Sequence, residues 1–461
     1  MAELREECGV FAIYGDEAAA LKTYWGIFSL QHRGQESAGI AVLAPDATIS
    51  VNKGMGLVTE VLKPEEEAGR RGRAALGHVR YSTFGESTLI NAQPLLMRTR
   101  FGPLALAHNG NVVNAPFLKR ELEEEGAVFQ GTTDSEVLAH FIARSRRRMV
   151  REALMESLPR LGGGFAFVVL TSHGLYAMRD PWGIRPLVLG KTPEGAVVVA
   201  SETCAFDTIG ARALREVEPG ELLEIGDDGA YQSFRFAEVE PTRRAPCAFE
   251  VIYFARADSQ IDGRSAHVSR RALGHRLAEE APAPGDVVVG VPDSSLPAAM
   301  GYAETAGLPF DFGLVKNRYI ARTFIAPRQE DREMGVQLKL SAVPEVVRDK
   351  KVVLVDDSLV RGTTSRRLVQ LLREAGAREV HMRIASPPYT HPCHYGIDTS
   401  RATELAARNM TVEAIRAMVG ADSLAYLSLE GLKAALGGHP WCLACFGAGY
   451  PVAPAEPVDG E

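Results

Sequence analysis

The sequence lacks several features that would assign it to a broad class at once. No apolar run approaches the ~20 residues of a membrane-spanning helix, and the acidic residues 1–7 lack the basic and apolar regions of a secretory signal. The formal net charge of −7 gives no electrostatic argument for nucleic-acid binding. Six cysteines in 461 residues do not suggest a disulfide framework, so metal binding or catalysis explains them better. These absences predict a cytoplasmic protein with no membrane or nucleic-acid partner.

The remaining composition predicts a globular protein with a large core. Apolar residues make up 46% of the chain and charged residues 24%, which are ordinary values. The length is enough for two or three domains. No internal repeat or low-complexity tract interrupts it. We expect the last residues, 452–461, to form a mobile tail because they are rich in proline, alanine and acid.

The two halves of the chain differ in the pattern of their apolar runs. In the first half, short runs separated by turn residues predict strands of a layered sheet structure, with helices around 134–158. After a plausible connector at 238–246, strands and helices alternate, which predicts a parallel sheet. The predicted strands are 104–107, 165–170, 187–189 and 197–200, then 287–291, 351–355 and 379–384, with helices beginning at Leu296 and Thr364.

The most informative motif is the segment 350–367. Its branched apolar residues 352–355 suit a buried strand of a parallel sheet, and two carboxylates, Asp356 and Asp357, follow directly. The loop 361–364 then opens a helix, whose first N–H groups favour a phosphate. Carboxylates beside a phosphate cradle suit the hydroxyls of a ribose or a Mg²⁺ ion. The phosphate loop G-x-x-x-x-G-K-[ST] is absent here.

This segment resembles the phosphoribosyl-diphosphate (PRPP) motif of type I phosphoribosyltransferases. The PDSS turn at 292–295 resembles the loop of that family that receives the diphosphate. The resemblance implies that Ser294, Asp356 and Asp357 contribute to a Mg²⁺ site. It implies that PRPP is bound by Asp356, Asp357, Ser358, Arg361, Gly362, Thr363, Thr364 and Lys316.

The basic and aromatic segment 316–341 has no regular pattern. It is either a solvated connector or, as it resembles, the flexible loop of PRPP amidotransferases, which closes over bound substrate and excludes water. The candidates there for binding diphosphate or closing the site are Lys316, Arg318, Tyr319 and Arg322.

The first half contains a set of separated motifs around an early cysteine, Cys8. They are LQHRGQESAGI (30–40), GHVRYSTFG (77–85), AHNGNVVN (107–114) and TTDSEVL (132–138). Together they resemble the class II glutamine amidotransferases, in which an N-terminal cysteine attacks the glutamine side-chain amide. The α-amine of such a residue has a pKa of about 7.7–8.0 and can act as its base. Met1–Glu7 are therefore predicted to be a propeptide.

The same resemblance implies roles for individual residues of the first half. Asn109 and Gly110 match the oxyanion hole, which stabilises charge that develops in the transition state. Arg80 matches the residue that pairs with the α-carboxylate of glutamine, and Asp134 matches the one that holds its α-amino group. Arg33 is predicted to shape this pocket. His32, His78 and His108 are predicted to be structural, since an N-terminal nucleophile needs no histidine base.

The union of the two halves resembles the amidophosphoribosyltransferase family. It implies a layered α-β-β-α glutaminase domain at 8–238, after the propeptide, and a phosphoribosyltransferase domain at 239–461. The expected reaction opens purine biosynthesis and converts PRPP, glutamine and water to 5-phosphoribosylamine, glutamate and diphosphate, with ammonia channelled between two sites. The resemblance also implies inhibition by purine nucleotides and a homotetramer.

Four of the cysteines are candidate ligands of one metal centre. Cys442 and Cys445 form C-x-x-C, and Cys247 and Cys393 match further positions in the iron–sulfur members of this family. The resemblance implies a structural [4Fe–4S] cluster. A Cys₄ zinc site is the alternative, because the ligand set alone does not separate the two. Cys204 has no predicted role beyond a buried small residue.

Two other functions compete with this interpretation. A different class II amidotransferase would need another acceptor domain, which VVLVDDSLVRGTT argues against. A non-enzymatic PRPP-sensing regulator would keep the PRPP motif but has no use for Cys8, Arg80, Asn109 and Asp134. No DNA-binding module is evident in the sequence.

Overall fold

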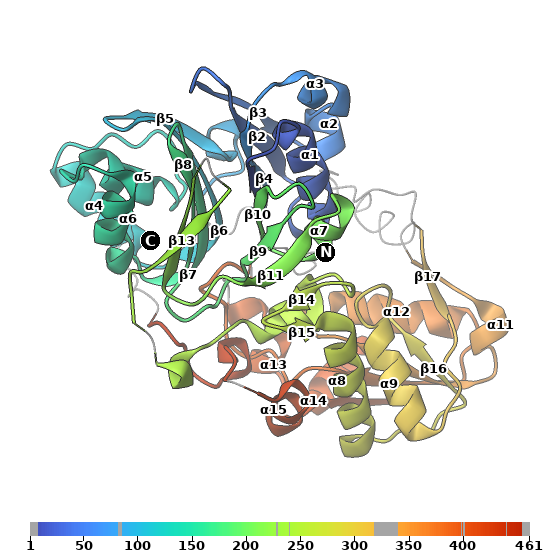
Figure 1. Ribbon diagram of the computed structural model, residues 1–461. Coiled ribbons are helices and arrows are strands. Elements are labelled where there is room, and N and C mark those ends of the chain that lie inside the picture. The colour runs from blue at the N-terminus through green and yellow to red at the C-terminus, as the bar shows by residue number, and fades with distance from the viewer. Residues whose placement is uncertain are drawn as a thin grey trace.

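The computed structural model shows two parts that lie side by side (Figure 1). The structure describes residues 8–81, 85–226, 229–238, 240–317, 340–397, 399, 402–438 and 440–453. The predicted propeptide 1–7, loop residues Arg318, Tyr319 and Arg322, and tail residues 454–461 lie outside these ranges.

Two antiparallel sheets pack face to face in the first part. The seven-stranded sheet has the order β11 (Arg212–Glu216), β9 (Val188–Lys191), β10 (Val197–Ala200), β1 (Gly9–Tyr14), β4 (Ala74–Arg80), β2 (Ser37–Leu43), β3 (Ile49–Met55). The six-stranded sheet has the order β13 (Tyr231–Arg235), β12 (Glu221–Ile225), β8 (Gly174–Arg179), β7 (Gly163–Thr171), β6 (Gly102–Val112), β5 (Leu95–Thr99).

Helices cover the outer face of each of these sheets (Figure 1). On the seven-stranded sheet lie α1 (Ala19–Ser29), α2 (Val58–Val61) and α7 (Cys204–Thr208), with α3 (Pro64–Gly69) beside α1. On the six-stranded sheet lie α4 (Ala115–Glu124), α5 (Glu136–Arg144) and α6 (Val150–Ser157). This arrangement confirms the predicted α-β-β-α layers.

Strand β1 shows why its sequence is apolar throughout. Val10, Ala12 and Tyr14 point into the core between the two sheets, whereas Phe11 and Ile13 pack under the helices. Successive side chains of a strand alternate between its faces, so a strand with both faces covered needs apolar residues at every position.

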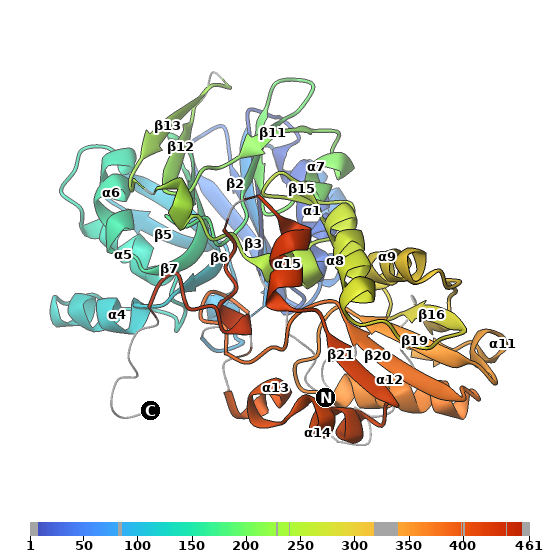
Figure 2. The same ribbon diagram turned by 90° about the horizontal axis from the view of Figure 1, so that it is seen from below.

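A four-stranded parallel sheet forms the second part, with the order β16 (Val287–Gly290), β19 (Lys351–Asp356), β20 (Glu379–Ile384), β21 (Ser423–Tyr426). One face is covered by α8 (Ala266–Glu280), α9 (Leu296–Ala306) and α15 (Leu429–Leu436). The other is covered by α11 (Pro344–Val347), α12 (Thr363–Glu374), α13 (Ala406–Asn409) and α14 (Val412–Val419), as Figure 2 shows from below. Two small ribbons complete it, β14 (Gln260–Ile261) with β15 (Arg264–Ser265) and β17 (Leu314–Lys316) with β18 (Leu340–Ala342).

The predicted parallel sheet is therefore confirmed, with small shifts at its boundaries. Val352 and Leu354 of β19 pack on the side of α12, and Val353 and Val355 on the side of α8 and α9. Helix α12 begins at Thr363, one residue before the prediction. The exact domain boundary at 238/239 stays a prediction. No helix within the described ranges is long and apolar enough to cross a membrane.

Helices α8 and α9 approach each other so closely that their backbones touch. A Cβ atom on Gly274 would lie 1.9 Å from the carbonyl oxygen of Ala298, and one on Gly301 would lie 2.1 Å from that of Arg271. Both glycines are buried. Their missing side chains set the spacing of the helix pair that carries the PDSS turn at the start of α9.

We therefore predict that Gly274→Ala destabilises the protein although alanine is the better helix former by about 1 kcal/mol. Overpacking of a tight contact costs about 1–3 kcal/mol, and here the neighbour is rigid backbone. The measurement is the midpoint temperature of the lowest calorimetric transition, since a chain of this size need not unfold in two states. Gly69→Ala is the matched control, because nothing lies within 4 Å of that Cβ position. An equal effect of both substitutions would contradict the tight contact.

Candidate active sites

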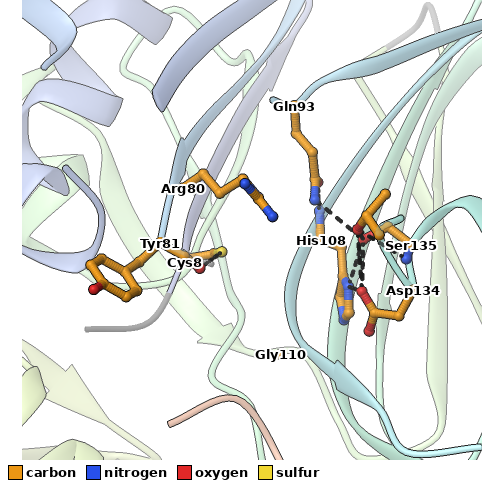
Figure 3. Close-up of a pocket in the computed structure, with 9 residues that line it drawn as sticks. Cys8, Arg80, Tyr81, Gln93, His108, Gly110, Asp134 and Ser135 are labelled. Carbon is orange, nitrogen blue, oxygen red and sulfur yellow. Dashed lines mark hydrogen bonds and ion pairs between the residues drawn. The ribbon is translucent and has the colours of Figure 1, made fainter. Parts of the chain in front are cut away.

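A pocket opens between the two antiparallel sheets, next to the start of β1. Figure 3 shows Cys8 and Arg80 on one wall and His108, Asp134 and Ser135 on the other. Arg80 ends β4, and Asp134 and Ser135 directly precede α5. The lining residues are Cys8, Arg80, Tyr81, Gln93, His108, Gly110, Thr133, Asp134 and Ser135. The structure thus brings together four residues that the sequence placed in separate motifs, Cys8, Arg80, Gly110 and Asp134.

The thiol of Cys8 is held in its neutral form. Its Sγ donates to the carbonyl oxygen of Tyr81 at 3.4 Å. Burial raises the pKa of Cys8 to about 11, although the Tyr81 hydrogen bond and the positive charge of Arg80 act in the opposite direction. A nucleophile in this state needs a base close to the sulfur to become a thiolate.

The predicted oxyanion residues lie on β6, beside the start of β1. Asn109 is fully buried, and its Nδ2 donates to Ser201 Oγ at 3.4 Å. Ser201 Oγ also accepts a hydrogen bond from Val10 N at 3.0 Å, so this hydroxyl joins Asn109 to the nucleophile's strand. The sequence analysis missed Ser201, because its segment Ser-Glu-Thr (201–203) matches no motif and its contacts depend on the fold.

Gly110 has a geometric reason to be glycine. Its φ is 126°, and a Cβ atom there would lie 2.1 Å from the carbonyl oxygen of Gly164. Only a residue without a side chain allows β6 to approach β7 so closely at this point. The position therefore presents backbone, not side chain, to the pocket.

Arg80 and Asp134 provide opposite charges on opposite walls of the pocket (Figure 3). Arg80 Nη1 donates to the Glu86 carbonyl oxygen at 3.3 Å and lies 3.5 Å from Glu36 Oε2. Asp134 Oδ2 accepts from Val112 N at 2.7 Å. Burial acts to raise the pKa of Asp134, but the nearby His108 and the hydrogen bonds lower it overall. A fixed cation facing a fixed anion matches the α-carboxylate and α-amino groups of an amino acid.

His108 is a lining residue that the sequence analysis treated as structural. Its ring stacks on Phe167 with centroids 4.0 Å apart, and its Nδ1 lies 2.9 Å from Ser135 Oγ and 3.7 Å from Asp134 Oδ1. The ring therefore fixes the wall that carries Asp134. The motif AHNG was the available signal, since it places this histidine next to Asn109.

Arg33 lies beneath Cys8 and is not among the lining residues. It is 1% exposed, and its Nε donates to the carbonyl oxygen of Cys8 at 3.1 Å. Its Nη atoms pair with two buried carboxylates, Glu202 and Glu250. A direct role of Arg33 in glutamine binding stays a prediction.

A second site forms at the carboxyl end of β19. Asp356 and Asp357 are both buried there, beside the turn that begins α9. Ser294 Oγ donates to Asp357 Oδ2 at 2.5 Å, and Ser295 Oγ donates to Asp356 Oδ1 at 2.9 Å. The carboxylate motif and the PDSS turn, more than 60 residues apart, therefore meet at one edge of the sheet, as predicted.

The surroundings of Asp356 and Asp357 raise the pKa of both carboxyl groups. Burial raises the pKa of Asp356 to about 8, and the negative charge of Asp357 adds to the shift. Burial also raises the pKa of Asp357, against hydrogen bonds from Ser294 and Ser358 and the charge of Arg270. Two adjacent buried carboxyls with hydroxyl neighbours form an oxygen donor set that suits a hard cation such as Mg²⁺.

The loop 361–364 leads from the carboxylate pair into helix α12. Gly362 has φ 80° and precedes the first helical residue of α12, where Thr363 is exposed and Thr364 half-buried. Arg361 pairs with Glu404, with Nε 2.8 Å from Oε2. Lys316 ends β17 and its Nζ lies 2.9 Å from Asp293 Oδ2 of the PDSS turn. The loop thus follows the carboxylate pair in the chain, and Lys316 contacts the PDSS turn.

The four predicted ligand cysteines gather between the two parts of the molecule. Cys247 and Cys442 lie in adjacent extended segments, where Cys442 N donates to the Pro246 carbonyl oxygen at 2.8 Å. All four are free thiols, and three are at most 8% exposed. Burial raises the pKa of Cys445 well above its usual range, and the charges of Cys247, Cys442 and Cys393 add to the shift. Mutual electrostatic influence of this kind requires four sulfurs in one neighbourhood.

Within the described ranges, no group of three or more His, Cys, Asp or Glu side chains is arranged to hold a single metal ion. A mononuclear zinc site needs all ligands at about 2.0–2.3 Å from one point.

Comparisons with known proteins cover nearly the whole chain. A glutamine amidotransferase domain family matches residues 78–208, and a phosphoribosyl transferase domain family matches residues 261–386. The amidophosphoribosyltransferase of Bacillus subtilis is 53% identical over 97% of this chain and 94% of its own length. The chloroplastic amidophosphoribosyltransferase 1 of Arabidopsis thaliana is 48% identical over 98% of this chain and 80% of its own.

Solved structures agree with these sequence relatives. The glutamine PRPP amidotransferase of B. subtilis, complexed with ADP and GMP, aligns with a TM-score of 0.91 and 51% identity over 98% of this chain and 99% of that chain. Because similarity at this level runs through both parts of the molecule and both candidate sites, the chain belongs to the amidophosphoribosyltransferase family.

Proposed function

We propose that this chain transfers ammonia from glutamine to PRPP, giving 5-phosphoribosylamine, glutamate and diphosphate with consumption of water. The observation that carries the proposal is the presence of two candidate sites of different chemistry in one chain. The cysteine pocket between the antiparallel sheets suits an amino-acid amide. The carboxylate pair at the parallel sheet suits a ribose phosphate.

In the first half-reaction, the Cys8 sulfur adds to the side-chain carbonyl carbon of glutamine. The negative charge that develops on the carbonyl oxygen is taken up by Asn109 Nδ2 and Gly110 N. Collapse of this intermediate expels ammonia and leaves a thioester, which water hydrolyses to glutamate and free thiol. Arg80 and Asp134 hold the amino-acid end, so the amide stays over the sulfur.

A propeptide would control the deprotonation of Cys8, because it would block the α-amine that we propose as the base. Because burial holds the pKa of the thiol at about 11, deprotonation near neutral pH needs a base within reach. A free α-amine on Cys8 would meet this need, with a pKa of about 7.7–8.0. We therefore propose that Met1–Glu7 are removed before glutamine can be used.

In the second half-reaction, ammonia displaces diphosphate at C1 of PRPP. Asp356 and Asp357 accept hydrogen bonds from the ribose hydroxyls, and the first turn of α12 with Thr363 and Thr364 holds the 5-phosphate. When bound, Mg²⁺ held by Asp356, Asp357 and Ser294 would neutralise charge on the departing diphosphate. We propose that Lys316 and the PDSS turn, which are in contact through Asp293, bind that diphosphate.

We also propose a [4Fe–4S] cluster on Cys247, Cys393, Cys442 and Cys445. Burial raises the pKa of Cys442 and Cys445, and the positive charge of bound iron would offset the repulsion between neighbouring thiolates. The cluster would be structural, since it joins the C-terminal segment 440–453 to Cys247 at the junction of the two parts.

Further proposals concern regulation and assembly. The B. subtilis structure holds ADP and GMP, and a purine nucleotide carries the ribose 5-phosphate that the α12 loop is shaped to hold. We propose that purine nucleotides inhibit this enzyme by binding there. A homotetramer and a cytoplasmic location stay predictions.

The first test substitutes the nucleophile. Cys8→Ala should abolish glutamine-driven diphosphate release and leave ammonium-driven release near the wild-type rate, because only the amide chemistry needs sulfur. Intact-mass measurement of active wild-type protein should show a chain that begins at Cys8. Active protein that retains Met1–Glu7 would contradict the α-amine mechanism, and PRPP binding with no turnover by either donor would favour the regulator.

A second test addresses the ribose site. Asp357→Asn should weaken PRPP binding by roughly tenfold or more with either nitrogen donor, because a hydrogen bond to a charged group contributes about 1.5–3 kcal/mol. Isothermal titration with PRPP and Mg²⁺ measures this directly. The control is Asp422→Asn, an exposed carboxylate at the opposite, amino end of the parallel strands that pairs with Arg373. Equal weakening in both variants would contradict the assignment.

A third test addresses the cluster. Protein purified without oxygen should contain about four irons per chain and show the broad visible absorbance of thiolate-ligated iron. Cys445→Ser should lower the iron content, whereas Cys204→Ser should keep it, because Cys204 contacts Glu202 and lies apart from the four. Stoichiometric zinc without iron would establish the Cys₄ zinc alternative instead.

A further inference from the structure

Glu250, a residue of the second part, binds two arginines that lie behind the cysteine pocket. This carboxylate is fully buried. Its Oε1 accepts from Arg33 Nη2 at 2.5 Å and from Arg185 Nη2 at 2.8 Å, and its Oε2 accepts from Arg33 Nη1 at 3.0 Å. One carboxylate therefore holds two buried guanidinium groups at fixed positions.

Each of these arginines contacts one half of the catalytic apparatus. Arg33 Nε donates to the carbonyl oxygen of Cys8 at 3.1 Å, so it fixes the main chain of the nucleophile. Arg185 packs against the oxyanion strand, since its Cγ lies 2.9 Å from the position of a Cβ on Gly110. Glu250 thus connects, through two side chains, the sulfur's backbone and the oxyanion glycine.

Glu250 belongs to the second part of the molecule by its packing. It begins the π-helical turn Glu250–Phe254, whose apolar residues lie in the core with α8, α9 and α15. Arg270 of α8 fixes this turn by donating to the carbonyl oxygens of Val251 at 2.8 Å and Ala255 at 2.7 Å. The position of Glu250 is therefore set by the phosphoribosyltransferase part and not by the glutaminase sheets.

We propose that Glu250 is a positioning residue of the glutaminase reaction: through Arg33 and Arg185 it sets the distance between the Cys8 sulfur and the oxyanion hole. This inference rests on the proposed function of Cys8. Arg33 then acts on the nucleophile's backbone and does not touch glutamine. The glutaminase site is complete only when the second part is folded against it.

The physical reason is that removing one partner of a buried ion pair leaves the other charge buried without compensation. Without the Glu250 charge, Arg33 and Arg185 both lose the negative charge of this carboxylate, while the ion pair of Arg33 with Glu202 remains. Breaking one partner of a buried ion pair leaves an uncompensated charge, which the structure relieves by moving it. A shift of about 1 Å in a reacting group lowers the rate by on the order of a hundredfold. The contacts of Arg80 and Asp134 with substrate do not involve Glu250.

The test compares Glu250→Gln with Glu221→Gln in the full-length protein. Glutamine keeps the size of the side chain and removes its charge. Glu221 is an equally buried carboxylate of β12 that pairs with Arg215 at 2.7 Å and lies outside the pocket lining. Each variant is assayed with PRPP and Mg²⁺ using glutamine or ammonium, and its N-terminus is read by intact mass.

We expect Glu250→Gln to lower kcat with glutamine by roughly tenfold to a hundredfold, with little change in KM for glutamine and in the ammonium-driven rate. Glu221→Gln should match wild type with both donors. Arg33→Lys keeps the buried charge but lacks the forked guanidinium, so it should show the same selective loss. Glu250→Asp should recover part of the glutamine-driven kcat.

Several outcomes would overturn the inference. These are an unchanged glutamine kcat in Glu250→Gln, an equal loss with both donors, or a change confined to KM for glutamine. Retention of Met1–Glu7 in Glu250→Gln alone would assign Glu250 to maturation instead of positioning. A wild-type enzyme that uses ammonium but not glutamine, although its chain begins at Cys8, would overturn the proposed role of Cys8 and this inference with it.

Discussion

The rest of the structure depends on one buried cluster of charges around Arg33. Its guanidinium pairs with Glu202 and Glu250, which lie 169 and 217 residues away in the chain. Glu202 in turn accepts from Arg256 N at 3.0 Å and from Ser259 Oγ at 2.7 Å, both in the second part. Buried ion pairs contribute little net stability, because desolvation offsets their attraction. We infer that their value is specificity, because Glu250 pairs with Arg33 and Arg185 only when the two parts dock in one register.

This constraint explains how Cys8, the proposed nucleophile, can be held in place directly before strand β1. A residue at the end of a strand would fray without anchoring. Here Arg33 binds the carbonyl oxygen of Cys8, Tyr81 accepts from its sulfur, and Ser201 accepts from Val10 N two residues later. Three contacts from three separate segments fix a short stretch of chain. The second part therefore contacts the Cys8 backbone indirectly, through Glu250 and Arg33.

The sequence predicted the sheet layers and the proposed reaction, but not the buried contacts of Arg33 that connect the two parts. The strands β7, β10 and β19 follow from short continuous apolar runs, which are local and visible in any window of a few residues. The meeting of the PDSS turn with Asp356 and Asp357 also followed, because carboxyl ends of parallel strands share one edge. The role of Arg33 did not follow, since its partners are set by the docking of distant segments. Ser201 was missed for the same reason.

The two sites and the cysteine cluster share one electrostatic principle. In each, burial keeps a titratable group neutral that its proposed chemistry needs ionised: the pKa of Cys8 lies at about 11, that of Asp356 at about 8 and that of Cys442 at about 12. A charged partner supplied from outside would reverse each shift, because an opposite charge at short range favours the ionised form. The proposed partners are Mg²⁺ for the carboxylates and iron for the thiols. Cys8 differs, because its proposed base is an amine of the same residue. A base of that kind needs no second buried charged side chain in the pocket, where desolvation would shift that side chain's own pKa away from use.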